Sequence, residues 1–188
     1  MTEFDEKIND LDNKIPKWFA IYTRSRAEKS VYEQLKKINI ETYLPLKREL
    51  RQWSDRQKLV EIPLFKSYVF VKVVTTEYYK IPPLIVGFHS FVMIRGNRIA
   101  VRDDEIETIR LLLQHNDNEI EITNENFENG EKIQIVKGIL KGKFGELIKY
   151  KGKKQIVIRL ESLQTNVIIE IDRRYIKKLE KNLEIEKF

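Results

Sequence analysis

The chain divides at an acidic, asparagine-rich stretch that separates two basic segments. Residues 116–127 hold four acidic and no basic residues, whereas residues 1–115 carry 20 basic against 16 acidic residues and residues 128–188 carry 15 against nine. Five of the seven glycines fall in a 23-residue window of the last segment. A composition shift of this kind is typical of a domain boundary. We therefore expect five parts: a flexible leader (1–16), a first domain (17–115), a linker (116–127), a second domain (128–180) and a tail (181–188).

The start of the first domain predicts a strand followed by a helix. Lys17–Thr23 (KWFAIYT) is aromatic and β-branched, which favours a strand buried on both faces. In Ser25–Ile38 the apolar residues recur at helical spacing, and Ser25 with Glu28 forms the pattern of a capping box. The domain as a whole reads as α+β, with helices packed on an antiparallel sheet.

Prolines and a glycine mark the ends of elements and a turn in the rest of this domain. Glu41–Trp53 reads as one extended strand in which Pro45 indicates an edge or a bulge, and Pro63 is expected to break the strand pair or bent strand at Leu59–Val74. Thr76–Ile81 predicts a short helix that the two following prolines stop. A hairpin turn is expected at Gly96, and Asp103 is expected to cap a second helix.

The second domain predicts a small β-barrel. Short β-rich runs recur at roughly ten-residue spacing with polar or glycine turns between them. Gly130, Gly138, Gly142 and Gly145 are expected at these turns, where positive φ angles favour glycine. Two points stay open: the alternation at 119–122 is either a strand or free chain, and 173–181 is either a short helix or a final strand with a tail.

The residue types in the chain provide few groups from which a catalytic site could be built. There is no cysteine, and His89 and His115 are the only histidines, which excludes thiolate chemistry and disfavours multi-histidine metal sites and Ser–His–Asp relays. Helix capping explains the acidic cluster Asp103–Glu105. We therefore expect a protein without cofactor or metal that is not an enzyme. No apolar run approaches the roughly 20 residues of a membrane span, and the acidic start is unlike a secretory signal, so a cytoplasmic location is expected.

Large rings gather in the first domain, at Phe65, Tyr68, Phe70, Phe88 and Phe91. They are either ordinary core or the lining of a pocket that holds an apolar partner helix. Strand alternation places Tyr68 and Phe70 on one face and Phe65 on the other, unless a bulge at the nearby proline intervenes.

Basic residues gather at the first helix. Arg24, Arg26, Lys29 and Lys37 are either a solvated face or contacts to phosphates and single-stranded bases. The net charge of +6 permits a polyanionic partner without requiring one.

Two stretches in order resemble the NusG family of transcription elongation factors. The run at 17–28 (KWFAIYTRSRAE), Tyr43–Pro45 and Pro63–Val71 (PLFKSYVFV) resemble its N-terminal domain, and Phe127–Gly145 resembles the KOW motif of its C-terminal domain. The first helix and the short middle region are closer in style to the RfaH-like and UpxY antiterminators of capsular polysaccharide operons.

The resemblance implies that the first domain binds the clamp helices of the large catalytic subunit of RNA polymerase. The matching pocket residues are Phe65, Tyr68 and Phe70, with Phe88 and Phe91 nearby. It also implies contacts with exposed non-template DNA, for which the candidates are Arg24, Arg26, Gln34 and Lys37.

The second domain is implied to contact a ribosomal protein or termination factor Rho through a loop at Ser162–Asn166, with Leu163 as its apolar tip. The expected function is an operon-specific antiterminator, acting as a monomer, that suppresses pausing and termination. Surface polysaccharide genes are the implied targets. The alternative is a free-standing RNA- or ribosome-binding protein that acts through the basic second domain.

Overall fold

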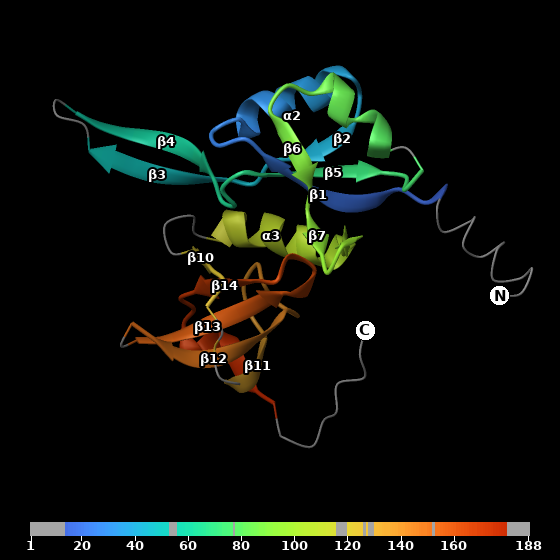
Figure 1. The fold of residues 1–188 in the computed structure, drawn as a ribbon. Helices are drawn as coiled ribbons and strands as arrows, with labels where there is room; N and C mark the ends of the chain where they lie inside the picture. The colour runs from blue at the N-terminus through green and yellow to red at the C-terminus, as the bar shows by residue number, and fades with distance from the viewer. Residues whose placement is uncertain are drawn as a thin grey trace, which may run out of the picture.

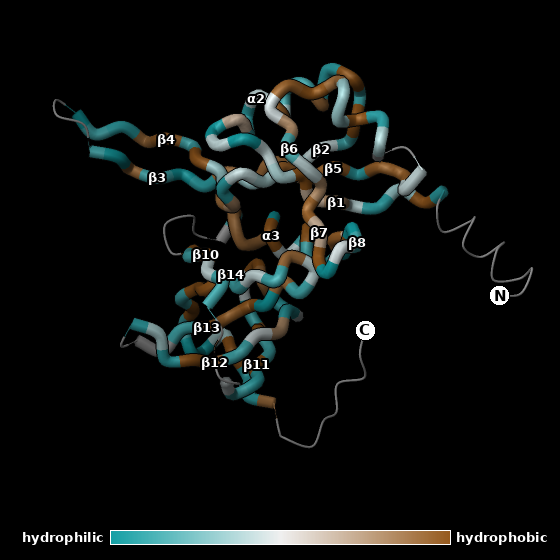
Figure 2. Tube along the Cα trace, viewed as in Figure 1, coloured by the Kyte–Doolittle hydropathy of each residue, from teal (hydrophilic) through white to brown (hydrophobic). Residues whose placement is uncertain are grey.

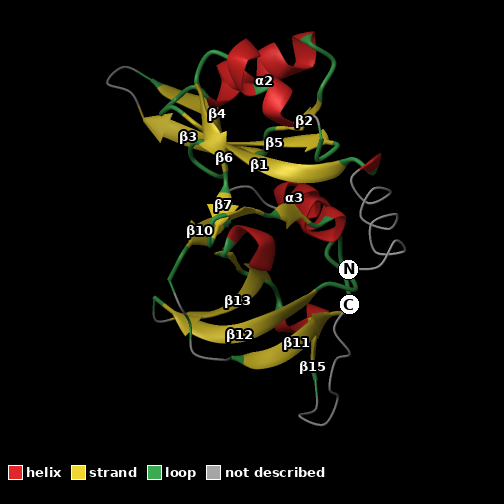
Figure 3. Cartoon of the chain, turned by 45° about the vertical axis from the view of Figure 1, so that its right-hand side comes forward, coloured by secondary structure: helices red, strands yellow, loops and turns green. Residues whose placement is uncertain are grey.

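Two antiparallel sheets, separated by a helix, form the body of the protein. The structure is a computed structural model that describes residues 14–52, 56–76, 78–115, 120–125, 127, 130–151 and 153–179. Helix α3 (Asp103–His115) lies between the two sheets in both ribbon views (Figures 1 and 3). The predicted leader and tail fall almost wholly outside the described residues.

The first sheet has the order β2-β5-β1-β6, and β9 also pairs with β1. Its strands are β1 (Lys17–Thr23), β2 (Glu41–Tyr43), β5 (Tyr68–Val73), β6 (Phe88–Phe91) and β9 (Ala100–Val101). The predicted strand at 17–23 is confirmed, and it is central because β5 pairs along one edge and β6 and β9 along the other. This central position explains its nearly continuous apolar sequence, since both faces are covered.

The predicted first helix is confirmed as α2 (Glu28–Lys37), which buries Val31 and Leu35. The predicted capping box is wrong, because the helix starts after Ala27 and no side chain caps it. Glu28 instead accepts a hydrogen bond from the backbone N–H of Ser67 at 2.7 Å. Its carboxylate therefore ties the helix to the turn before β5.

A two-stranded ribbon, β3 (Leu46–Gln52) and β4 (Gln57–Pro63), projects from the first sheet (Figure 1). It pairs from Leu46 opposite Pro63 to Gln52 opposite Gln57. In Figure 2 it is largely hydrophilic, in contrast to β1 and β5. The expected break at Pro63 is confirmed, because Pro63 ends β4. The single strand predicted over 41–53 is wrong, because Pro45 lies between β2 and β3, which belong to different sheets.

The chain between β5 and α3 runs through short elements. They are the 3₁₀ helices η1 (Tyr78–Lys80) and η2 (Pro82–Leu84) and the hairpin strands β7 (Met93–Ile94) and β8 (Asn97–Arg98). The two prolines begin η2, so the prediction that they only end a helix is incomplete; fixed φ suits the first helical turn. The hairpin is confirmed, with Gly96 at φ 81°.

The second sheet is six-stranded, in the order β10-β14-β13-β12-β11-β15. Its strands are β10 (Glu121–Thr123), β11 (Glu131–Ile135), β12 (Phe144–Tyr150), β13 (Lys153–Leu160), β14 (Thr165–Ile169) and β15 (Ile176–Lys178). The 3₁₀ helices η4 (Glu161–Leu163) and η5 (Arg173–Tyr175) connect the last three strands. The first open point resolves as a strand, because part of the acidic stretch is β10. The second contains both alternatives, because η5 is a short helix and β15 follows it as a final strand.

The motif glycines serve two purposes. Gly138 and Gly142 adopt positive φ angles of 80° and 90°, so the predicted turns are confirmed there. Gly145 lies inside β12, where a Cβ atom would stand 2.8 Å from a side-chain carbon of Ile156. A Cβ on Gly130 would stand 2.5 Å from the carbonyl oxygen of Leu147. A turn role for Gly130 and Gly145 is therefore wrong; these positions allow close approach of neighbouring strands.

Candidate partner-binding site

The first sheet presents two faces with different coverings. Trp18, Ala20 and Tyr22 alternate along β1 and stand opposite residues of β5, with Phe70 beside Ala20 and Tyr68 beside Tyr22. We call this side, together with Tyr43 of β2, the aromatic face. The intervening β1 residues point to the other side, which α2 covers and which we call the α2 face.

Phe65 joins the aromatic face although it precedes β5. Its ring meets that of Phe70 edge-on, with centroids 5.9 Å apart, and Tyr43 lies 6.2 Å from Phe70 on the other side. Strict strand alternation, which places Phe65 on the opposite face from Tyr68 and Phe70, does not hold here. The chain turns between β4 and β5, with Ser67 at φ 64°, so strand alternation does not run through Phe65.

Phe88 and Phe91 belong to the opposite side of the sheet. Phe91 pairs with Ile21 in the strand register, lies 6.3 Å from the Phe19 ring and packs in the core beneath α2. Phe88 packs against the same core and lies 5.5 Å from Phe91. The expectation that these two rings lie near the Phe65–Tyr68–Phe70 pocket is therefore wrong.

The rings of the aromatic face differ in solvent exposure: the buried rings support the surface, and the exposed rings are available for contact. Phe70 is fully buried and Phe65 is 6% exposed, whereas Tyr22 is 41% exposed. Tyr22 meets Tyr68 edge-on at 5.5 Å and His89 at 5.7 Å. Burial, with a smaller contribution from Tyr22, raises the pKa of Tyr68. Sequence reasoning missed Tyr22, although alternation along β1 places it on this face.

Helix α3 covers the aromatic face. Its inner residues Ile106, Ile109 and Leu112 are almost completely buried in a core that includes Trp18 and Phe70. The Arg110 guanidinium lies 5.1 Å from the Tyr43 ring centroid and 5.9 Å from that of Trp18. Burial raises the pKa of Tyr43 to about 12, and the Arg110 charge opposes part of that rise.

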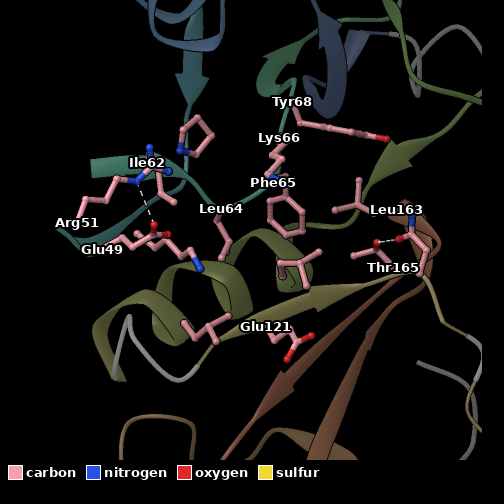
Figure 4. Close-up of a pocket in the computed structure, with 15 residues that line it drawn as sticks. Glu49, Arg51, Ile62, Leu64, Phe65, Lys66, Tyr68, Glu121, Leu163 and Thr165 are labelled. Carbon is pink, nitrogen blue, oxygen red and sulfur yellow. Dashed lines mark hydrogen bonds and ion pairs between the residues drawn. The ribbon is translucent and has the colours of Figure 1, made fainter. Parts of the chain in front are cut away.

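A cavity of about 570 Å³ remains where the aromatic face meets the second sheet (Figure 4). Phe65 and Tyr68 line it from one side, and Leu163 and Thr165 line it from the other. Leu163 packs against the same apolar core as Phe65. Two sites that were predicted separately, the aromatic pocket and the loop at Leu163, thus meet at one interface.

Polar links flank this interface on α3. The Glu105 side chain is 3% exposed and accepts a hydrogen bond from the Ser162 backbone N–H at 3.1 Å. Arg102 lies 3.4 Å from the same carboxylate, and Lys143 donates to the Asp104 carbonyl at 3.4 Å. Within the described residues, the second oxygen of Glu105 has no hydrogen-bond partner. Sequence reasoning assigned Glu105 to helix capping, and nothing local signals a bond to a residue 57 positions away.

The candidate DNA-contact residues do not form one cluster. Arg24 and Arg26 are exposed just before α2, while Lys37 lies in its last turn, roughly 15 Å away at 1.5 Å per residue. The Gln34 amide is occupied: it donates to the Val86 carbonyl and accepts from the Val86 N–H, both at 2.9 Å. Gln34 therefore fixes the loop before β6 to α2.

The described part of the chain holds no group of three or more histidine, aspartate or glutamate side chains placed to bind a metal ion. None of its helices combines the length and apolar character needed to cross a bilayer.

The family, the relatives and the solved structure that this chain is similar to all carry the name NusG. The sequence model of the family described as "Transcription termination factor nusG" matches residues 16–110. Two proteins named "Transcription termination/antitermination protein NusG", from Streptococcus pyogenes serotypes M3 and M1, are each 26% identical over 176 residues, which cover 86% of this chain and 96% of theirs. The solved structure "Domain interaction in Thermotoga maritima NusG" is similar in fold, with a TM-score of 0.51 at 19% identity over 89% of this chain and 99% of that one.

Proposed function

Because the chain belongs to the NusG family, we propose that it is a non-enzymatic transcription elongation factor that binds RNA polymerase and suppresses pausing and termination. It would act by binding the elongating state more tightly than the paused state, which shifts the population between them. Its relatives in Streptococcus pyogenes carry names that include both termination and antitermination.

The aromatic face is the observation that carries this proposal. Tyr22 and Tyr68 offer partly exposed rings, and Tyr68 lines the cavity together with Phe65, whose ring packs on the buried ring of Phe70. A surface that combines aromatic rings with charged side chains suits an amphipathic partner helix. The clamp helices of the large catalytic subunit of RNA polymerase are the partner we assign to it.

The second sheet limits access to the cavity side of this face. Leu163 and Thr165 line the far side of the cavity beside Tyr68, so a partner helix that enters there competes with η4. We infer that the structure is a resting form and that polymerase binding separates the two sheets. The Leu163 loop then becomes available to its own partner, a ribosomal protein or Rho.

The finer assignments follow the sequence resemblance. We propose that 17–115 is a NusG N-terminal domain and that 128–180 is a KOW barrel whose sheet recruits β10 from the connecting stretch. The protein would act in the cytoplasm as a monomer at particular operons, in the manner of RfaH-like and UpxY antiterminators. Arg24, Arg26 and Lys37 remain candidates for contact with non-template DNA, whereas Gln34 has a structural role in this arrangement.

Copurification with RNA polymerase and terminator readthrough in vitro test the proposal. The wild type should copurify with polymerase and increase readthrough, and Tyr68→Ala should lose both while its melting temperature stays close to that of the wild type. The matched control is Tyr79→Ala, which removes a ring that is 64% exposed on η1.

A Tyr68→Ala variant that still binds polymerase as the wild type does would show that the pocket is wrongly assigned. If the wild type binds ribosomes or RNA and never polymerase, the alternative of a free-standing RNA- or ribosome-binding protein replaces this function. Failure of the Tyr79→Ala control would indicate that loss of any ring disturbs binding.

A further inference from the structure

An exposed apolar surface lies along the second half of α2. Leu84 and Val86 are 61% and 78% exposed, whereas Ile81 and Ile85 of the same segment are buried in the core beneath the helix. The two hydrogen bonds between the Gln34 side chain and the Val86 backbone hold this segment in place. The fold therefore fixes two large apolar side chains in contact with solvent.

This surface continues to the end of α2. A Cβ atom on Gly87 would stand 3.0 Å from the Ala27 Cβ at the start of the helix. Val86 lies beside Gln34, so the segment runs back along α2 toward its last turn. Ile38, one turn after Gln34, is 40% exposed there. Neighbouring exposed apolar residues indicate an interaction site, which we call the η2 surface: Ile38, Leu84 and Val86.

Positive charge surrounds the η2 surface. Lys36 and Lys37 in the last turn of α2 and Lys80 at the end of η1 are exposed. Neither η1 nor η2 contains an acidic residue, and Glu33 is the acidic residue in the last two turns of α2. A partner for this surface should therefore combine apolar side chains with negative charge.

The start of the chain has this chemistry. Residues 1–13 hold five acidic residues and one basic residue, whereas residues 14–188 hold 24 acidic and 34 basic residues. Phe4, Ile8, Leu11 and Ile15 recur at the spacing of one face of an amphipathic helix. Lys14, the first described residue, is helical. The leader thus offers an apolar face and a net negative charge to a positively charged body.

The leader joins the first sheet at the end where the η2 surface lies. Lys17 at the start of β1 pairs with Val73 at the end of β5, and Glu41 of β2 pairs with Lys72. Because η1 follows β5 and α2 precedes β2, both elements meet the sheet at this end. Figure 1 shows the start of β1 and the end of β5 on the same side. A helix of 13 residues is about 20 Å long, against about 15 Å for α2, so it can cross the surface.

We propose that the leader binds the η2 surface of its own chain, with its apolar residues against the exposed apolar side chains there. The surrounding lysines then face its carboxylates. A segment tethered this close is present at an effective concentration on the order of millimolar, so a weak intrinsic affinity is enough to hold it. This inference goes beyond the proposed function and does not depend on polymerase binding.

Disulfide formation in the full-length protein tests the proposal. The chain has no cysteine, so the pair introduced by Ile8→Cys/Leu84→Cys is unambiguous. At micromolar protein concentration under mild oxidation, this pair should link within one chain about tenfold faster, or more, than the matched control Ile8→Cys/Met93→Cys.

Met93 suits the control because it is 51% exposed and also close to the start of β1. Its neighbour Val92 donates a hydrogen bond to the Ala20 carbonyl at 2.8 Å. Strand β7, which contains Met93, lies beside α3 in Figures 1 and 3, away from α2. An unbound leader would reach both cysteines at similar rates.

Changes in the leader test whether its apolar face holds it. Phe4→Ser/Leu11→Ser, added to the Ile8→Cys/Leu84→Cys pair, should slow the link to the rate of the Met93 control. Asn9→Ser/Asn13→Ser alters polar leader residues instead and should change the rate by less than about twofold. An unchanged melting temperature of each reduced variant verifies that the fold is retained.

Equal rates at Leu84 and Met93 would overturn the proposal, because the leader would then have no preferred surface. A faster link to Met93 would place it on the other side of the sheet. A covalent dimer in place of the internal link would mean that the leader binds a second copy, which also contradicts the proposal. Tyr68→Ala should leave the rate unchanged, so loss of polymerase binding and loss of leader binding remain separate results.

Discussion

The two faces of the first sheet are buried by different means. The α2 face is covered by residues of the same half of the chain, and its core runs from Phe19 to Phe91. The aromatic face is covered by α3 and by the second sheet, so its core continues from Trp18 to Ile169. One face is complete within about seventy consecutive residues, whereas the other needs segments from both halves of the chain.

This difference supports the proposal that the aromatic face can exchange its covering, whereas the α2 face keeps its own. The α2 face is tied by side-chain bonds that span its own elements, as Gln34 to Val86 and Glu28 to Ser67 show. The interface on the aromatic face combines apolar contacts with a few longer polar links, such as Arg102 to Glu161 at 4.0 Å. Apolar contact is not directional, so a partner helix with an apolar face can substitute for the second sheet there.

Truncation of Phe70 should have the largest effect on stability. Phe70→Ala removes a fully buried ring that contacts Phe65 and Tyr43, and such changes cost about 3–5 kcal/mol. Urea unfolding measures this loss. A cost below about 1 kcal/mol would show that the aromatic face is loosely packed rather than rigid, which contradicts its role as support for Tyr68.

Removal of the Glu105 carboxylate should loosen the two sheets by a smaller amount. Glu105→Ala deletes the acceptor of the Ser162 N–H, and hydrogen bonds to charged groups contribute about 1.5–3 kcal/mol. Hydrogen exchange should become faster around η4 and stay unchanged along α2. The matched control is Glu107→Ala, an exposed carboxylate of the same helix. Equal protection in both variants would exclude a link through Glu105.

Alkaline pH should weaken the aromatic face selectively. The pKa of Tyr43 is about 12 in the folded chain and 10.0 in the reference state. A raised pKa means that the neutral phenol is stabilised by folding, so the contribution is complete below pH 10 and is lost as the pH rises toward 12. The wild type should lose about 1–2 kcal/mol more than Tyr43→Phe between pH 10 and 12, with allowance for partial solvent exposure. Parallel unfolding curves for the two proteins would contradict this.

The sequence predicted what depends on local pattern. The strand at Lys17–Thr23, the body of α2 and the turns at Gly96, Gly138 and Gly142 all follow from short-range periodicity or from φ angles that glycine adopts. The failures share a cause of a different kind. Strand alternation misplaces Phe65 because Ser67 breaks the alternation. Glu105 does lie in the first turn of α3, but its bond to Ser162 cannot be predicted because Ser162 lies in the other half of the chain.

The candidate site was predicted in part for the same reason. Tyr68 and Phe70 share a face because they stand two residues apart in one strand. The abundance of large rings and the family resemblance both group Phe88 and Phe91 with this pocket. The pairing of β6 with β1 instead places these two rings under α2.

The pairing of β10 with β14 sets the length of the tether between the two halves. With β10 in place, five residues connect α3 to the second sheet, a reach of at most about 17 Å at 3.4 Å per residue. If β10 detaches, the connection extends to Gly130 and its reach to about 50 Å. While β10 stays paired, a displaced second sheet remains near the aromatic face at an effective concentration on the order of millimolar. After release of polymerase, the second sheet would then return rapidly to the aromatic face. The length of the tether would set how long the two stay apart.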